Sequence, residues 1–331
     1  MKKFIKIFIP ICVIALLLVG GYFYWQHQKF YPSTDDAYIQ AHVINIAPRV
    51  NGKVEAVYVQ DHQHVKKGQI LFAIDPTPYK IALAKAQAAF SSAVLQYKAA
   101  NMAIKSAHYQ VAQYRAQLVD TQAETQRMLT LVKKHYASKS QSDLAIKNLQ
   151  VAQASLKAAQ SNLAEAVQKR GLSGPQNSHL REAAATVAQA KLNLRYTHVL
   201  APAAGYIANF NLRQGDVVTA YQNLFALIED TLWWAEANYK ETQLQRIHPG
   251  QTAHIKVDMY PGHVFNGKVA SISDGSGASF SLLPPENASG NWVKVTQRFP
   301  VKIIITHQNP KYPLRLGSSC TVIINTTDNK K

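Results

Sequence analysis

Two stretches of the chain are copies of one another, and about 120 residues of a different character lie between them. The first, 50–75, reads VNGKVEAVYVQDHQHVKKGQILFAID, and the second, 203–228, reads AAGYIANFNLRQGDVVTAYQNLFALI. A shift of 153 positions superimposes the two without a gap. The shared positions are glycines and alternating apolar residues: Gly52/Gly205, Val54/Ile207, Val65/Val218 and Leu71/Leu224. The repeat implies two equivalent structural units.

Each copy alternates apolar and polar residues between glycines, which is typical of short half-buried β-strands. One copy is too small to bury a core of its own. Two copies packed face to face bury both apolar faces, so we expect one β-sandwich built from 43–75 and 197–229. Its turns are predicted at four glycines: Gly52, Gly68, Gly205 and Gly215.

The segment between the copies, 76–196, predicts a long antiparallel helical hairpin. Residues 79–137 contain no glycine or proline and are rich in Ala, Gln and Lys, which favour helix. A helix of roughly 60 residues is about 90 Å long and needs a partner helix. We expect its seam at apolar residues spaced by seven: Ile81, Ala88, Leu95, Met102, Tyr109, Ala116 and Ala123.

The returning arm is predicted at 142–170, with an alanine and leucine heptad seam. The seam residues are Leu149, Leu156 and Leu163, together with Ala145, Ala152, Ala159 and Ala166. The tip of the hairpin is expected at about 133–142. Gly171–Ser178 breaks the arm as a loop or a kink, and helix resumes before the second copy.

The N-terminal residues predict a membrane anchor. Residues 1–6 carry lysines and form a cytoplasmic tail, and 7–25 are an apolar run without charge that spans the bilayer. An interfacial aromatic belt closes it: Tyr22, Tyr24 and Trp25. A cleaved signal peptide is the alternative, with Gly21 at the cut. The rest of the chain then lies outside the inner membrane, beginning with a linker, 26–42, that contributes a strand to the barrel described next.

Residues 230–327 predict an antiparallel β-barrel. Short alternating runs are bounded by Gly, Pro and Asn, as in all-β domains. The expected strands are Trp233–Asn238, Thr252–Asp258, Gly267–Ile272, Val293–Gln297, Val301–Thr306 and Ser319–Asn325, with a short helix at Lys240–Ile247. The fold class is therefore multidomain α+β: anchor, split sandwich, coiled-coil hairpin and barrel.

The sequence offers no catalytic or cofactor motif, so we expect neither an enzyme nor a cofactor or metal site. The two cysteines, Cys12 and Cys320, lack metal or redox spacing. His62 and His64, beside Asp61, are interpreted as part of a solvated turn because the second copy lacks both. The net charge of +17 lies largely on the predicted coiled coil, where few aromatics accompany it, so nucleic-acid binding is not expected.

This order of segments resembles the membrane fusion protein family, the periplasmic adaptors of haemolysin-secretion (HlyD) and multidrug-efflux type. Each copy is similar to half of a lipoyl domain, although Asp75-Pro76 stands where a carrier would present its lysine. Four motifs look like the EmrA-type branch of the family: Ala201–Tyr206 (APAAGY), Tyr239–Leu244 (YKETQL), Phe280–Ala288 (FSLLPPENA) and Gly290–Arg298 (GNWVKVTQR).

The resemblance implies an adaptor subunit of a tripartite multidrug efflux pump in a Gram-negative bacterium, contributing to antibiotic resistance. Its partners would be an inner-membrane major-facilitator exporter, a TolC-like outer-membrane channel and copies of itself in a trimeric or hexameric ring. An adaptor of an ATP-driven type I polypeptide secretion system is the alternative.

The resemblance also implies a docking site for the channel at the hairpin tip, formed by Arg127, Leu131 and Ser138. Arg127 and Leu131 share one helix face, and Ser138 lies at the turn. Supporting positive charge comes from Lys133, Lys134 and Lys139. From the residues alone, Arg127 would be a solvated charge and Leu131 a seam residue.

Overall fold

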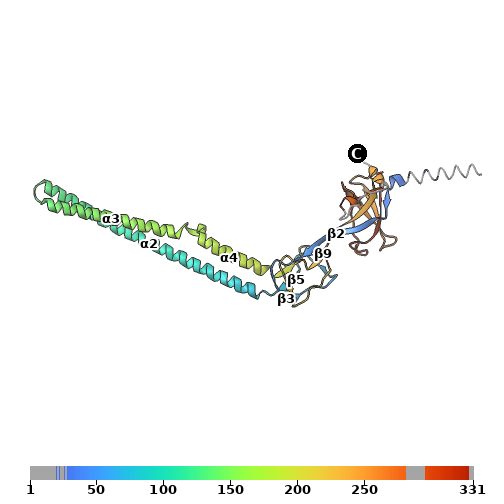
Figure 1. The fold of residues 1–331 in the computed structure, drawn as a ribbon, viewed down its shortest axis with the longest axis horizontal. Helices are drawn as coiled ribbons and strands as arrows, with labels where there is room; N and C mark the ends of the chain where they lie inside the picture. Colours follow the sequence, from blue (N-terminus) through green and yellow to red (C-terminus); the bar gives the residue numbers. More distant parts are fainter. Residues whose placement is uncertain (1–19, 21, 23–25, 27, 281–294, 328–331) are drawn as a thin grey trace, which may run out of the picture.

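The computed structural model describes residues 28–280 and 295–327, together with residues 20, 22 and 26. The molecule is elongated, with a barrel, a sandwich and a helical hairpin in a row (Figure 1). The predicted tail and anchor lie outside the described residues except for two positions, and of the expected aromatic belt only Tyr22 is described. Within the described part, no helix is both long enough and apolar enough to cross a membrane.

Strands from both copies build the sandwich. The first copy supplies β3 (Gly52–Val57), β4 (His64–Val65) and β5 (Ile70–Ile74), and the second supplies β7 (Gly205–Ala208), β8 (Val217–Val218) and the start of β9 (Phe225–Lys240). The end of β2 (Ala37–Ile46) and the short β6 (His198–Leu200) complete it.

The two copies pair across each other. Gly52 of β3 lies opposite Val218 of β8, and Val65 of β4 lies opposite Gly205 of β7. The two pairs are equivalent, because Gly205 is the counterpart of Gly52 and Val218 is the counterpart of Val65, each 153 positions further along. The pairing is therefore reciprocal, and neither copy completes its own sheet.

Single hydrogen bonds obey the same relation. The Val54 N–H donates to the Asp216 carbonyl at 2.8 Å, and the Ile207 N–H donates to the Gln63 carbonyl at 3.0 Å. These bonds also differ by 153 positions in both donor and acceptor. Because the partners are 162 and 144 residues apart in the chain, the sandwich forms only when the hairpin has brought the copies together.

The core of the sandwich draws on both copies. Phe72 and Ile74 of the first copy and Ile207 and Leu227 of the second are fully buried in one cluster. Each such side chain contributes about 1.5–3 kcal/mol on burial. Removing either copy would therefore remove a large part of the core and one partner of each strand pair that joins the copies.

The barrel follows the sandwich without a break, because β2 and β9 run through both. Its other strands are β1 (Ser33–Thr34), β10 (Thr252–Val257), β11 (Val264–Ile272), β12 (Arg298–Ile305) and β13 (Cys320–Ile324). The strand order β13-β10-β11-β12-β9 is antiparallel throughout, and β2 pairs with β9. A bridge between Tyr38 and Ser319, with an Ile39 N–H to Ser318 carbonyl bond of 2.9 Å, closes the circle.

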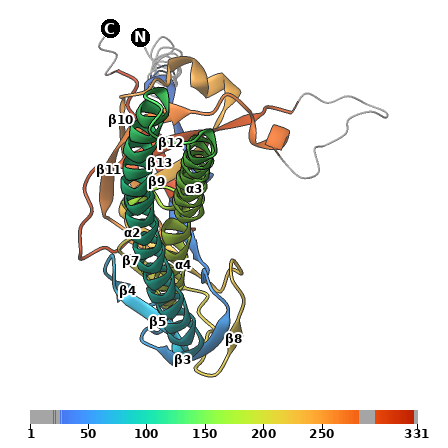
Figure 2. The same ribbon diagram turned by 90° about the vertical axis from the view of Figure 1, so that its left-hand side faces the viewer.

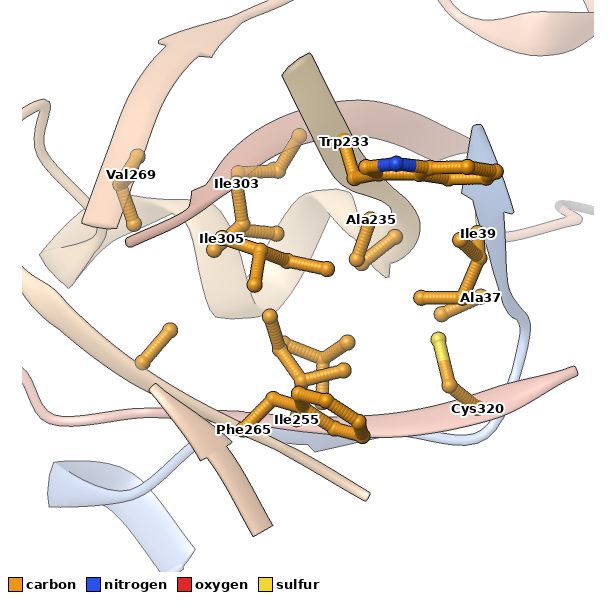
Figure 3. Packing of buried hydrophobic residues seen from close by; sticks show 14 of the residues in the cluster. Ala37, Ile39, Trp233, Ala235, Ile255, Phe265, Val269, Ile303, Ile305 and Cys320 are labelled. Carbon is orange, nitrogen blue, oxygen red and sulfur yellow. The ribbon is translucent and has the colours of Figure 1, made fainter. Parts of the chain in front are cut away.

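Apolar side chains from every wall fill the barrel, with Ile39, Ala235, Ile255 and Ile303 fully buried (Figure 3). The strand expected from the linker is present as β1 and the start of β2. The strand expected at Val293–Gln297 is wrong where the structure describes it, since 295–297 are not extended in a sheet and β12 begins at Arg298. The expected helix at Lys240–Ile247 is a 3-10 helix over Glu241–Arg246.

The hairpin consists of α2 (Thr77–Lys133), α3 (Lys139–Arg170) and α4 (Ser178–Arg195). With 57 residues, α2 is about 86 Å long. The helices α3 and α4 follow one another beside it, so that one long helix packs against two shorter ones (Figure 2).

The seam predicted for α2 is wrong, whereas the seam predicted for α3 is buried or half-buried as expected. In α2 the residues that face α3 and α4 are two positions further along, and they are all buried or half-buried: Leu83, Phe90, Tyr97, Ile104, Val111, Leu118, Thr125 and Val132. Small residues such as Ala86 and Ala93 alternate with them. Both series have a period of seven, so the period alone does not choose between them.

The residues first assigned to the seam form an exposed apolar line on the opposite side of α2, which we call the outer stripe. Its large members are more than 60% exposed: Ile81 65%, Leu95 66%, Met102 68% and Tyr109 63%. The equivalent outward positions of α3 are more polar: Lys147, Ala154, Ser161 and Gln168. At these four positions α3 therefore has no large apolar side chain, although Leu144 and Val151 elsewhere on α3 are more than half exposed.

Two of the four predicted turn glycines, Gly68 and Gly215, occupy turns with φ of +81° and +99°. The other two begin strands, Gly52 in β3 and Gly205 in β7, where they allow close approach of a neighbouring strand. A Cβ on Gly205 would overlap the backbone carbonyl of Ile228. The Ile228 carbonyl belongs to the backbone of β9, so it cannot move away from the added methyl group by a side-chain rotation.

We therefore predict that Gly205→Ala destabilises the sandwich by at least about 2 kcal/mol, because β7 and β9 must separate to admit the methyl group. Thermal unfolding of the full chain measures it. Gly277→Ala is the matched control, since a Cβ there meets no heavy atom within 4 Å. Equal melting temperatures for the two variants would contradict the close approach.

Candidate functional site: the hairpin tip

The tip is a short ordered turn between α2 and α3. His135 adopts a left-handed conformation with φ of 62°. Its N–H donates to the Val132 carbonyl at 3.0 Å, and the Tyr136 N–H donates to the Leu131 carbonyl at 2.9 Å. This pair of bonds is a Schellman motif, which satisfies the last carbonyls of a helix. The turn therefore has a defined shape.

Ser138 begins α3 as its N-cap. Its hydroxyl accepts a bond from the Gln141 N–H at 3.3 Å, and the Gln141 side chain accepts one from the Ser138 N–H at 2.8 Å. This reciprocal capping box satisfies two donors that the first turn of a helix leaves free. Ser138 thus has a structural task that the sequence interpretation did not include.

Arg127 and Leu131 lie together on the outer face of α2. With Lys134 they line one shallow hollow, whose other residues are Ala123, Gln126 and Thr130. Leu131 is 42% exposed, and the neighbouring Val132 is the one that faces the seam. The interpretation of Leu131 as a seam residue is therefore wrong. Ser138 does not line this hollow.

Arg127 has a partner within its own helix. Its guanidinium lies 2.8 Å from the Glu124 carboxylate, and both side chains are more than half exposed. Exposed pairs three or four residues apart contribute only about 0.3–0.5 kcal/mol. The pair holds Arg127 loosely, so an external acceptor can compete for it.

Basic residues surround the turn. Lys133 is the last residue of α2, Lys134 follows it and Lys139 is the first residue of α3, and all three are exposed. A positive charge at a helix C-terminus interacts favourably with the helix dipole, and Lys133 is placed to do so at the end of α2. The tip presents an exposed leucine within a positively charged rim.

At the other end of the hairpin, Asp75 stands where a carrier would present its lysine. Asp75 accepts a bond from the Thr77 N–H at 2.9 Å as α2 begins, and this bond holds the pKa of Asp75 below its ordinary value. The histidines near the sandwich turn are paired singly: His62 with Asp61 at 3.3 Å and His64 with Asp230 at 2.7 Å. The described residues contain no cluster of His, Cys, Asp or Glu with metal-binding geometry.

The interruption at Gly171–Ser178 is a hydrogen-bonded loop. Asn177 is 3% exposed; its amide donates to the Arg170 and Leu172 carbonyls, and its oxygen caps α4. The Gly174 N–H donates to the Tyr97 hydroxyl of α2 at 2.7 Å. The Gly174–Tyr97 bond attaches the loop to the opposite arm, and α4 then packs against α2 beyond the loop.

Comparison with known proteins assigns this arrangement. Residues 42–230 match the family described as RND MFP, barrel-sandwich hybrid domain, and residues 232–325 match the AAEA-like beta-barrel domain. The chain belongs to the membrane fusion protein family. The adaptors of efflux systems share this split sandwich with an inserted hairpin, and the resemblance drawn from the sequence is confirmed.

Individual relatives of this membrane fusion protein agree. It is 36% identical over 298 residues to the fatty acid resistance protein FarA of Neisseria gonorrhoeae, covering 89% of this chain and 76% of the relative. It is 31% identical over 318 residues to the multidrug export protein EmrA of Escherichia coli, covering 93% and 80%. The crystal structure of MacA from Actinobacillus actinomycetemcomitans shares the fold, with a TM-score of 0.53, 20% identity and 88% and 79% covered.

One feature of the tip could have been found in the sequence of this membrane fusion protein. Ser138 and Gln141 have the S-x-x-Q spacing of a capping box, which places the start of the returning arm at Lys139 rather than at 142. The exposure of Leu131 could not have been found in that way, because it depends on which of two heptad series faces the partner arm.

We predict that Ser138→Ala loosens the first turn of α3 by about 1 kcal/mol, whereas Ser138→Asp keeps the cap. Hydrogen exchange followed by mass spectrometry measures the change. Amides at 139–142 should exchange about fivefold faster in the alanine variant and remain unchanged in the aspartate variant. Identical exchange in all three proteins would show that the cap contributes nothing.

Proposed function

We propose that this membrane fusion protein joins an inner-membrane exporter of the major-facilitator type to a TolC-like outer-membrane channel in a tripartite efflux pump. The observation that carries the proposal is the placement of its parts. The barrel, which the first strand β1 joins, lies at one end of the molecule, and the basic tip lies at the other (Figure 1). A helix of about 86 Å separates the tip from the sandwich.

Small-molecule efflux is favoured over polypeptide secretion. The EmrA relative is named for multidrug export, and it aligns with 93% of this chain, including the barrel and the hairpin. An adaptor of an ATP-driven type I secretion system uses a similar plan, but it is the less supported alternative. The energy for transport would come from the exporter, since the sequence offers no nucleotide-binding or other catalytic motif.

The tip supplies the features that a docking surface for a channel needs. Leu131 gives an apolar contact, and Arg127 and Lys134 beside it give charge that complements acidic or carbonyl groups. The capping box of Ser138 and the Schellman motif of His135 fix the backbone of the turn beside these residues before contact. A preformed surface loses less entropy when it binds.

Site-specific crosslinking in cells tests the docking. A photo-crosslinking residue at Leu131 or at Lys134 should form an adduct with an outer-membrane channel, and one at Lys256, on the outside of the barrel, should not. Neither tip position takes part in the capping box, so the turn is preserved. Adducts only between copies of this chain, or none at all, would overturn docking at the tip.

We further propose that copies of the chain assemble into a trimeric or hexameric ring through the outer stripe. An apolar line with a period of seven follows a helix axis, so its complement is a helix that runs alongside. From Ile81 to Ala123 the stripe is about 63 Å long and about 10 Å wide, on the order of 600 Å². Specific interfaces use about 800 Å² from each partner, so the stripe supplies most of one.

Single hairpins also need such contacts to enclose a conduit. The long helices of a second copy are the partners that the chain itself provides. Because nothing else in the described part of the chain covers the stripe, its exposure in one copy is explained by burial in an assembly.

We predict that Leu95→Gln combined with Met102→Gln weakens self-association at least tenfold without lowering the melting temperature, because both side chains are exposed in the single copy. Sedimentation velocity of the full chain in detergent measures the association. Leu144→Gln on α3, at a residue that is 58% exposed, is the matched control. Unchanged association of the double variant would exclude the outer stripe.

A further inference from the structure

A cavity lies where the sandwich meets the barrel. It has a volume of about 440 Å³, within the range of sites that hold small molecules. One wall belongs to the sandwich, formed by β7 and the turn at His62, and the other belongs to the barrel, formed by the turn 313–316 before β13. Two residues of β9 form its floor, Ile228 and Trp233.

The two domains are joined at this point by the β2–β9 strand pair, whose hydrogen-bond ladder is interrupted here. The pairing of β2 with β9 is regular on both sides, with Ala41 opposite Trp233 and Val43 opposite Ile228. Between them a single residue of β2 faces four of β9, so the ladder is interrupted beside the cavity. The two walls are thus held by different domains across a bulge.

The lining is largely apolar, and each of its polar side chains can donate a hydrogen bond. Ile207, Ile228, Leu314 and Leu316 supply the apolar surface. The polar groups come from Trp233, Arg315, Tyr206 and His62, and the lining includes no acidic residue. Of the acids close in the chain to lining residues, Asp61 and Asp230 each lie beside a histidine, and Glu229 accepts a hydrogen bond from the Thr231 hydroxyl.

Trp233 makes the strongest case for a ligand. Its side chain is 4% exposed and closes one side of the barrel core (Figure 3). Among the described residues, its indole N–H has no hydrogen-bond partner. Every side-chain nitrogen or oxygen that is fully buried in the described part of the chain does have one. This N–H therefore retains access to open space, and the cavity is the space that Trp233 lines. An indole can only donate, so it calls for an acceptor.

Arg315 supplies the charge. It is exposed at the barrel wall of the cavity, and its guanidinium forms no ion pair with the described residues. A guanidinium matches a carboxylate with two parallel hydrogen bonds, and such bonds are about twice as strong as neutral ones. An acceptor that carries negative charge satisfies both Arg315 and Trp233.

We propose that this cavity binds an organic anion: a molecule with an apolar body and a carboxylate or similar acidic group. The body contacts the aliphatic lining, and the acidic group accepts hydrogen bonds from Arg315 and from the Trp233 N–H. Since the two walls belong to different domains, the bound molecule bridges the barrel and the sandwich. The proposal is independent of the exporter and of the channel, because binding is measured on this chain alone.

Three probes with one apolar body test the charge preference: 4-phenylbutyrate, 4-phenylbutan-1-ol and 4-phenylbutylammonium. Each is titrated into the full chain in a neutral detergent, and binding is measured by calorimetry and by saturation-transfer NMR. The anion should bind at least tenfold more tightly than the cation, with the alcohol between them. Equal affinity for anion and cation, or no binding of the anion, would overturn the proposal.

Variants locate the site. Arg315→Gln should weaken the anion at least fivefold and leave the alcohol unchanged, and Trp233→Phe should weaken both probes while keeping the ring in the core. Arg213→Gln is the matched control, because Arg213 is an exposed arginine of the sandwich that does not line the cavity. Should Arg213→Gln reduce anion binding as much as Arg315→Gln, the binding is a general effect of a basic surface. Arg315 is exposed, so its variant is expected to fold.

Discussion

The reciprocal pairing of the two half-motifs is the interaction on which the rest of the molecule depends. The Val54 N–H donates to the Asp216 carbonyl, and the Ile207 N–H donates to the Gln63 carbonyl, so each copy completes the other. Because the chain must leave the first copy and return for the second, the sandwich also fixes the two ends of the hairpin. The continuous strands β2 and β9 then fix the barrel on the opposite side.

Much of the fold followed from the repeat. The 153-residue shift predicts which residues are equivalent, and the structure extends the equivalence beyond the aligned stretches. The Gly68 N–H donates to the Ala201 carbonyl, and the Tyr221 N–H donates to the Pro48 carbonyl, again 153 positions apart. Left-handed turns are equivalent too: Gly215 corresponds to His62, and Gly68 corresponds to Tyr221. The equivalence of these turns is not visible in the sequence, because His62 and Tyr221 replace glycine in one copy of each turn.

The orientation of α2 could not be settled by periodicity. Two largely apolar series of residues, two positions apart, repeat every seven along the same helix. The series that faces the partner arm is the longer one and carries a large side chain at nearly every step, from Leu83 to Val132. In the ring proposed above, α2 packs both within its hairpin and against neighbouring copies, so it carries apolar residues on both faces. The amphipathic pattern of the sequence then does not identify the face that lies against the partner arm.

The tip illustrates how structural and functional demands share residues. Ser138 is occupied by its cap, while Arg127, Leu131 and Lys134 are held only by a weak surface pair or by nothing beyond their helix. The side chains that fix the shape of the turn and those that remain free to contact a partner are thus largely different.

The interrupted ribbon between barrel and sandwich makes the hairpin a lever. The pairing of β2 with β9 is interrupted at the bulge beside Trp233, and the tip lies at the far end of the hairpin beyond the sandwich. A rotation of about 10° at the bulge would carry a point about 86 Å away through roughly 15 Å. Small rearrangements beside the barrel would thus become large displacements at the tip, enough to follow a change in the gap that the molecule bridges.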